Sequence, residues 1–174
     1  MPSFDLDRPL PTADELYGTA ARVLEAARAG GVTVGTAESC TGGLVAATLI
    51  DVPGSSSVVR GGVVSYAIPV KHEVLGVSSD ILDDPALGAV SAECAGQMAC
   101  GARQVLGCDV AVSVTGIAGP GGEEPGKPIG TVWFGCSCGD SASTVLRIFS
   151  GSRSDVRHKA VATALDLVLD ALTS

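Results

Sequence analysis

Residues 32–50 read VTVGTAESCTGGLVAATLI, and the class of fold follows from this stretch of the 174-residue chain. Residues 32–37 form a short, mostly apolar run typical of a buried strand, and residues 44–50 form an apolar run typical of the start of a helix. Gly42 and Gly43 lie between them and permit a tight turn. A strand followed by a glycine turn and a helix predicts an α/β architecture.

Helices and strands continue to alternate on both sides of this unit. Thr12 and Glu15 predict a capping box for a first helix, which Gly30 and Gly31 end. We expect the remaining strands at 57–66, 109–115, 130–138 and 143–149, and the remaining helices at 70–75, 91–106 and from about 154 onward. The last two strands flank the turn 139–140 and are predicted to form a hairpin. The pattern predicts a three-layer α/β/α sandwich with a mixed central sheet.

The length gives one domain, which we assign to residues 12–174. Residues 1–11 contain three prolines and no hydrophobic periodicity, so we interpret them as a loose N-terminal extension. A secretory signal would need a basic start and an apolar core, which this stretch lacks, and no apolar run approaches the roughly 18 residues of a membrane helix. We therefore expect a cytoplasmic protein with no membrane contact.

Composition limits the function classes further. There are 19 acidic and 11 basic residues, a formal net charge of −8, which argues against nucleic-acid binding because phosphate contacts need a basic face. The six cysteines contain no CxxC pair and the two histidines follow no zinc spacing, so we expect free thiols, no metal and no cofactor. An anionic small molecule is still compatible with a local basic or backbone-amide site.

Ser39 is the first candidate for chemistry, because it lies between the predicted strand and the glycine turn. The N–H groups of Thr41, Gly42 and Gly43 at such a helix start could bind a phosphate or the oxyanion of an attacked carbonyl. The alternative interpretation is a hydroxyl that merely caps the helix. Cys40 is a rival nucleophile, since a thiolate at a helix N-terminus is stabilised by the same field.

A serine nucleophile needs a base, and neither histidine comes with a convincing aspartate partner. Lys71 is the alternative base, because burial could lower the pKa of its amine, although most lysines are solvated. The glycine-rich loop at 113–132 brings Thr115 to the end of a strand, and Arg153 at the start of the last helix could bind phosphate. Alternatively, the loop could be an ordinary surface loop, and Arg153 could be an ordinary solvated arginine.

Four segments, taken together, resemble one known family. They are TAESCTGG (36–43), VVSYAIPVKHEVLGV (63–77), VTGIAGPGG followed by KPIGTVWFG (114–135), and FSGSRSDVRHKAVATAL (149–165). Their order and spacing are similar to the C-terminal domain of the CinA competence and damage-inducible proteins, a family that also occurs as stand-alone nicotinamide-nucleotide amidases of the PncC type. No single segment is specific, but the combination is.

The resemblance implies a small-molecule nucleotide substrate, with deamidation of nicotinamide mononucleotide to nicotinate mononucleotide and ammonia. It makes Ser39 the nucleophile and Lys71 its partner, with Tyr66 nearby. The remaining substrate-binding residues that it implies are Thr115, Gly116 and Arg153. Family members often have Tyr-Ser-Asn where this chain has Tyr66-Ala67-Ile68, so Ile68 would weaken a contact or change specificity. A homo-oligomer is expected, because small α/β enzymes often associate.

Two other functions are compatible with these residues. The glycine loops could serve a nucleotide- or phosphate-binding module that performs no catalysis, an option that Ile68 keeps open. The chain could also be an interaction protein in competence or DNA repair. Three outcomes distinguish these functions: an amidase releases ammonia, a binding module binds the ligand without releasing ammonia, and an interaction protein captures a protein partner.

Overall fold

The computed structural model describes residues 7–139 and 141–174, and local sequence signals explain where its main helices begin. The helices are α1 (Ala13–Gly30), α2 (Leu44–Ile50), α3 (Ile68–Glu73), α4 (Ser79–Leu82), α5 (Ala92–Leu106) and α6 (Arg153–Thr173). Thr12 and Glu15 form the predicted capping box of α1, and the Ser91 side chain accepts the Cys94 N–H at the start of α5. Ser152 and Asp155 form a second capping box at α6. These three helix starts are confirmed to within two residues.

The central sheet has five strands in the order β2-β1-β3-β4-β5. They are β1 (Val34–Glu38), β2 (Val59–Val64), β3 (Val110–Gly116), β4 (Thr131–Cys138) and β5 (Ser141–Ile148). β1 pairs in parallel with β2 and β3, whereas β4 runs antiparallel to β3 and β5, so the predicted mixed sheet and its closing hairpin are confirmed. Residue 140 of the predicted turn lies outside the described residues.

Two short elements were not predicted, and one strand is shorter than expected. The 3-10 turn η1 (Ser55–Ser57) and helix α4 have three and four residues, too few to show a hydrophobic period. The strand predicted at 57–66 is confined to Val59–Val64. Its last residues leave the sheet instead, and this departure carries Ser65 and Tyr66 into the site described below.

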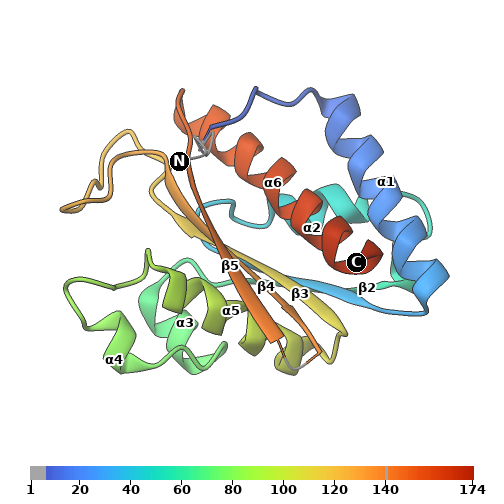
Figure 1. Ribbon diagram of the computed structural model, residues 1–174, viewed down its shortest axis with the longest axis horizontal. Coiled ribbons are helices and arrows are strands. Elements are labelled where there is room, and N and C mark those ends of the chain that lie inside the picture. The colour runs from blue at the N-terminus through green and yellow to red at the C-terminus, as the bar shows by residue number, and fades with distance from the viewer. Residues whose placement is uncertain (1–6, 140) are drawn as a thin grey trace.

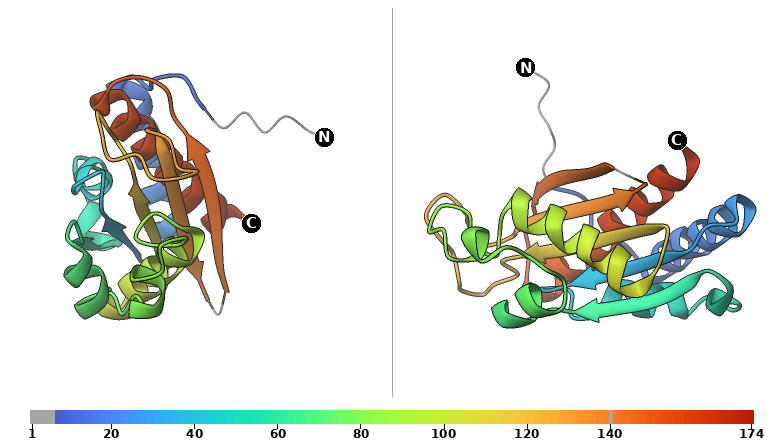
Figure 2. Two further views of the ribbon diagram at one scale, coloured as in Figure 1. Left: turned by 90° about the vertical axis from the view of Figure 1, so that its left-hand side faces the viewer. Right: turned by 90° about the horizontal axis from the view of Figure 1, so that it is seen from below.

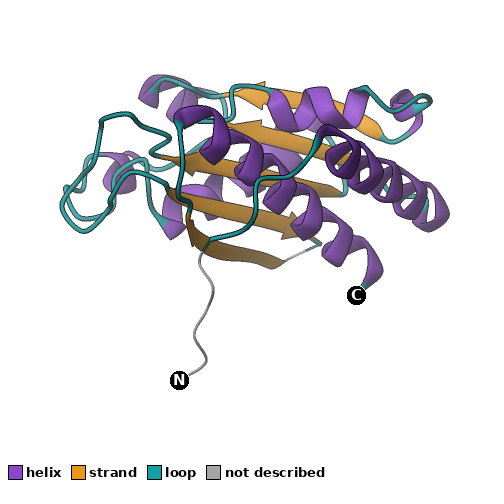
Figure 3. Cartoon of the chain, turned by 90° about the horizontal axis from the view of Figure 1, so that it is seen from above, coloured by secondary structure: helices purple, strands orange, loops and turns teal. Residues whose placement is uncertain are grey.

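The helices cover both faces of the sheet, as Figure 1 shows. α1 and α6 pack side by side over one face together with α2 (Figure 3), and α3, α4 and α5 lie on the other (Figure 2). With few aromatic residues, both layers of the core consist mainly of Val, Leu and Ala. α5 lies so close to the sheet that a Cβ at Gly135 would collide with the Ala95 carbonyl. The three-layer α/β/α sandwich is confirmed.

The strand order creates a point where the chain leaves the sheet in two directions. After β1 the chain crosses to β2 through α2 on one face, and after β2 it returns past β1 to β3 through α3, α4 and α5 on the other. Ligands of open α/β sheets bind in the crevice at the carboxyl ends of the strands at such a switch point. Here the switch point lies directly after Glu38.

The predicted extension at 1–11 falls largely on residues 1–6, which lie outside the described residues. Asp7 and Arg8 contact α6: the Lys159 amine lies 2.8 Å from the Asp7 carboxylate, and the Arg8 guanidinium lies 2.8 Å from Asp166. Among the described residues, no helix has both the length and the apolar character needed to cross a membrane.

Candidate active site

The turn after β1 presents Ser39 and is built around a buried carboxylate. Gly42 (φ +63°) and Gly43 (φ +96°) have left-handed backbone conformations that favour glycine. The Glu38 side chain, 1% exposed, folds back under the turn. Its two oxygens accept the N–H groups of Gly43, Val45 and Ala46 at 2.8–3.0 Å, and also the hydroxyl of Thr36 at 3.1 Å.

Glu38 therefore changes the interpretation of this helix start. The sequence suggested that the amides here could face a phosphate or an oxyanion. Of the three amides named there, that of Gly43 donates to the protein's own carboxylate, as do those of Val45 and Ala46 further along. This carboxylate also complements the positive end of the helix dipole. Sequence reasoning missed this role, although a lone acidic residue at the end of an otherwise buried strand was a signal for it.

Lys71 reaches Ser39 from the opposite side. It lies on α3, is 1% exposed, and its Nζ is 2.9 Å from Ser39 Oγ. Nζ also donates to the backbone carbonyls of Ser65, at 2.5 Å, and Tyr66, at 3.4 Å. No carboxylate lies within ion-pair distance of Lys71 in the part of the chain that the structure describes. Desolvation by burial lowers the pKa of its amine below the usual 10.5.

The rival nucleophile has a different environment. Cys40 is 6% exposed, and burial raises the pKa of its thiol to about 12. A thiol with such a pKa stays protonated at neutral pH, and the thiolate is the reactive form. Of the two neighbours, Ser39 is the one whose side chain contacts the Lys71 amine.

Arg153 and Tyr66 contact each other next to Lys71. The Arg153 guanidinium donates to the Gly119 carbonyl at 2.7 Å and lies 3.4 Å from the Tyr66 hydroxyl. Tyr66 is 64% exposed, so its ring is accessible from solvent. Its hydroxyl faces Arg153 rather than bridging Ser39 and Lys71, which already contact each other directly.

Thr115 and Gly116 hold the neighbouring strand end together. Thr115 is 1% exposed and its hydroxyl donates to the Ala89 carbonyl at 2.6 Å, so this group is already partnered. A Cβ at Gly116 would lie 2.5 Å from the Thr131 carbonyl, and only glycine fits between β3 and β4 at that point. The structure thus places both residues at the carboxyl end of β3, beside the turn that presents Ser39, with contacts to the protein itself.

Sequence reasoning missed a second arginine. Arg157 lies one helical turn after Arg153 and donates to the carbonyls of Cys40, at 3.1 Å, and Thr41, at 2.9 Å. Residues four apart share one face of a helix, so the pattern that pointed to Arg153 could also have found Arg157.

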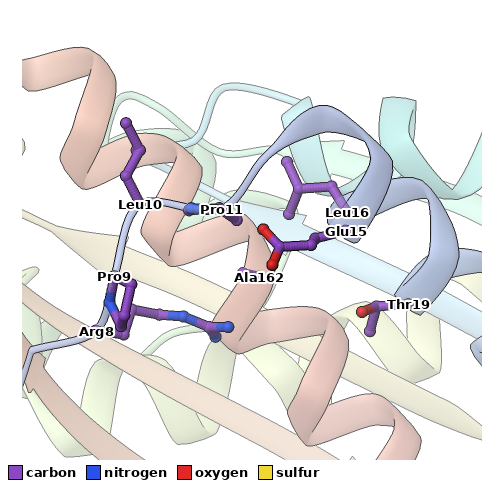
Figure 4. A pocket seen from close by; sticks show the side chains of 8 residues that line it. All are labelled: Arg8, Pro9, Leu10, Pro11, Glu15, Leu16, Thr19 and Ala162. Atoms are coloured by element: carbon purple, nitrogen blue, oxygen red, sulfur yellow. The ribbon is translucent and has the colours of Figure 1, made fainter.

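Other places in the described chain offer less chemistry. It contains no group of three or more His, Cys, Asp or Glu side chains arranged to hold a metal ion. A cavity of about 300 Å³ lies between residues 8–11, α1 and Ala162 (Figure 4). Its charged groups have protein partners, because Arg8 pairs with Asp166 and Glu15 caps Thr12. None of the residues that line it belongs to the Ser39–Lys71 pair.

The fold and site together define a class of protein: an α/β sandwich in which a serine and a buried lysine are in contact at the switch point of the sheet. The profile of the CinA C-terminal domain matches residues 17–172. The chain belongs to the CinA C-terminal domain family.

Individual relatives agree with this assignment. A CinA-like protein of Mycolicibacterium gilvum is 48% identical over 149 residues, which cover 85% of this chain but 35% of that protein, so the chain spans about a third of its length. A protein of Enterobacter agglomerans named nicotinamide-nucleotide amidohydrolase PncC is 44% identical over 155 residues, covering 88% of this chain and 93% of that protein. The crystal structure of competence/damage inducible protein CihA from Agrobacterium tumefaciens has a TM-score of 0.87 at 38% identity, covering 96% of this chain and 99% of that one.

Proposed function

We propose that this protein is an amidohydrolase that hydrolyses the carboxamide of nicotinamide mononucleotide to nicotinate mononucleotide and ammonia. The observation that carries the proposal is the contact between Ser39 Oγ and the amine of Lys71, a buried group with no carboxylate in ion-pair reach among the described residues. The relative named PncC supports the substrate, because this chain covers almost its entire length.

The contacts of Lys71 suit a neutral amine. A neutral amine has two N–H groups and one lone pair. In the neutral form the two N–H groups would donate to the carbonyl oxygens of Ser65 and Tyr66, and the lone pair would accept the proton of the Ser39 hydroxyl; the protonated form would donate to all three oxygens. Burial lowers the pKa of the amine and so favours this neutral form.

The first half of the reaction transfers the acyl group to the enzyme. Ser39 Oγ forms a bond to the carboxamide carbon while its proton moves to Lys71 Nζ, and the carbonyl oxygen becomes an oxyanion. The C–N bond then breaks, Lys71 returns the proton to the departing nitrogen, and ammonia leaves. The product of this half is an ester between Ser39 and the nicotinate group.

Water completes the reaction. Lys71, neutral again, takes a proton from a water molecule as its oxygen attacks the ester carbon. The bond between the acyl carbon and Ser39 Oγ breaks, and the proton held by Lys71 restores the serine hydroxyl. Every proton transfer in the cycle is thus assigned to one amine.

Arg153 is the residue that we assign to the phosphate of the substrate. Its guanidinium lies beside Tyr66 and has no carboxylate partner within the described ranges 7–139 and 141–174. Arginine carries five N–H donors in a geometry that matches phosphate, and only two are used by Gly119 and Tyr66. Ile68, 49% exposed at the start of α3, adds an apolar surface at the position where the family often has asparagine.

The test is ammonia release from nicotinamide mononucleotide, with nicotinamide riboside and free nicotinamide compared as substrates. We expect Ser39→Ala and Lys71→Ala each to lower turnover by roughly 10²-fold or more, because each removes a reacting group. Cys40→Ala is the matched control and should retain activity. Undiminished activity in either of the first two variants would remove that residue from the mechanism, and nucleotide binding without any ammonia release would favour a non-catalytic binding module.

A further inference from the structure

Exposed apolar side chains gather beside the turn that presents Ser39. Val64, at the end of β2, is 50% exposed, and Tyr66 and Ile68 follow it in the chain with similar exposure. Val64 lies against the turn itself, because a Cβ at Gly43 would be 3.4 Å from its Cγ2. Single exposed apolar residues are common on protein surfaces, but a group of them next to a reactive side chain is typical of a ligand-binding surface.

Tyr66 connects the two ends of the proposed substrate site. Its backbone carbonyl lies 3.4 Å from Lys71 Nζ, and its hydroxyl lies 3.4 Å from the Arg153 guanidinium. The tyrosine side chain therefore spans the gap between the amine that contacts Ser39 and the arginine that we assign to phosphate. A substrate with its carboxamide at Ser39 and its phosphate at Arg153 extends along this side chain.

The ring of Tyr66 is available for contact with a ligand. Its hydroxyl, at the edge of the ring, is the atom that contacts Arg153, and within the described ranges no second aromatic ring stacks on it. The face of an aromatic ring is the negative side of its quadrupole, so it attracts a cation. The ring of nicotinamide mononucleotide is such a cation, because its nitrogen is bonded to the ribose and carries a positive charge.

A carboxylate would be an unsuitable partner for that cation in this site. One close enough to attract the pyridinium ring would also stabilise the protonated form of Lys71, whereas the proposed mechanism needs the neutral amine. In the part of the chain that the structure describes, Lys71 and Arg153 have no carboxylate within ion-pair distance, and the Glu38 carboxylate accepts N–H groups of its own turn. An aromatic face attracts a cation without carrying a net charge, so it meets both requirements.

We propose that Tyr66 is the residue that determines specificity for a charged ring: the face of its ring stacks against the pyridinium ring of the substrate. The contact of its hydroxyl with Arg153 keeps the ring in this position. Tyr66 then binds substrate and takes no part in proton transfer, in agreement with the direct contact between Lys71 and Ser39. The inference rests on the proposed function for the identity of the nucleotide.

The affinities of two forms of one nucleotide test the proposal. Nicotinamide mononucleotide has a cationic ring, whereas its reduced form has a neutral ring with the same carboxamide, ribose and phosphate. Calorimetric titration of the Ser39→Ala protein measures affinity without turnover. We expect this protein to bind the cationic form about 3–30-fold more tightly, the range that a cation–π contact supplies. Tyr66→Leu in the same background should remove the preference, and Tyr66→Phe, which keeps the ring, should retain it.

Tyr17 provides the matched control. It is the other tyrosine of the chain and is 47% exposed on α1, so Tyr17→Leu should leave both affinities unchanged. In steady-state kinetics with Ser39 intact, Tyr66→Leu should raise KM by about 3–30-fold, while Tyr66→Phe should keep kcat within about threefold of the wild type. A fall in kcat of about 10²-fold in Tyr66→Phe would make the hydroxyl a proton carrier and overturn the proposal.

The binding outcomes also separate this inference from the proposed function. If the wild type released no ammonia, the proposed function would fail, while a preference for the cationic form that disappears in Tyr66→Leu would still support Tyr66. Equal affinity for the two forms, or a preference that survives in Tyr66→Leu, would overturn the role of Tyr66 whatever the amidase activity. Failure to bind either nucleotide would overturn both proposals. Tyr66→Gln carries the test if Tyr66→Leu does not fold, as judged by thermal unfolding.

Discussion

Two buried lysines in this molecule have opposite surroundings. Lys71 is 1% exposed and contacts two carbonyls and a serine hydroxyl, whereas Lys159 is 6% exposed and lies 2.8 Å from the Asp7 carboxylate. Burial lowers the pKa of Lys71, while at the second site the contact with Lys159 holds the pKa of Asp7 well below its usual 3.8. Burial alone does not make a lysine a base; a buried lysine becomes one where no carboxylate stabilises its charge.

The difference between Lys71 and Lys159 should have its largest effect on the rate of catalysis. Lys71→Met should lower kcat for ammonia release by about 10²–10⁴-fold, since it removes the proton acceptor. Lys159→Met removes a lysine of similar burial that has no contact with Ser39, and its loss of activity should be far smaller. Steady-state kinetics of both variants, with circular dichroism to check folding, make the measurement. Equal losses would show that the two lysines do not differ in the way that their contacts indicate.

A carboxylate placed next to the Lys71 amine should give this amine surroundings similar to those of Lys159. Cys94 is fully buried and is one of the thiols whose charge would act on Lys71. In Cys94→Asp a carboxylate would stabilise the protonated amine and return its pKa toward 10.5, so that activity at neutral pH should fall and recover as the pH rises. Cys94→Asn is the neutral control of similar size. An unchanged pH profile in Cys94→Asp would contradict the assignment of the base.

The pH dependence of the wild type follows from the same shift. Activity should rise with pH as Lys71 loses its proton and should level off below pH 10.5. Stability has the same sign: between the lowered pKa and 10.5 the unfolded chain binds more protons than the native one, so the free energy of unfolding increases with pH. Lys71→Met should lack this alkaline increase. Chemical denaturation at several pH values, compared with the rate profile, checks both.

Local signals in the sequence explain why most of the fold was predictable. The capping box of Thr12 and Glu15 and the glycine stop at Gly107 act within a few residues, and the structure confirms both. Strand order is a different matter, because it depends on which strands pair across long stretches of chain. The alternation of strands and helices predicted a mixed sheet, but no particular order.

Residues of the site could be predicted from the sequence only where they belong to a motif. Ser39 and Lys71 could be singled out from the sequence, although their contact spans 32 residues. Arg157 and the Cys40 carbonyl are 117 residues apart, and the partnership of Glu38 with the turn depends on how the strand end folds back. Local signals could single out Arg157 and Glu38 as residues, but not the groups that they contact. The resemblance to a family therefore supplied site residues, and the structure supplied the surroundings that give them chemistry.

A moderate effect is expected at the second lysine. Asp7→Asn leaves the buried amine of Lys159 without a carboxylate, and should lower the free energy of unfolding at pH 7 by about 1–2 kcal/mol, less than for a fully buried pair because Asp7 is partly exposed. Since folding lowers the pKa of Asp7, the stabilisation is present above pH 3.8 and is lost as the pH falls further. Urea denaturation of wild type and variant should therefore converge in acid. A constant difference at all pH values would exclude this carboxylate as its source.

The smallest effect should come from the neighbouring ion pair. Arg8 and Asp166 have side chains that are 31% and 50% exposed, and exposed pairs contribute about 0.2–1 kcal/mol. Arg8→Ala should therefore destabilise the protein less than Asp7→Asn, and 1 M salt should abolish most of that loss because it screens exposed charges. The loss in Asp7→Asn should largely persist in the same salt, since the amine of Lys159 is shielded from solvent. Suppose instead that Arg8→Ala lowered the free energy of unfolding more than Asp7→Asn did. The exposed pair would then be what holds the N-terminal segment. The presence or absence of a carboxylate beside a buried amine would no longer explain how the two lysines differ.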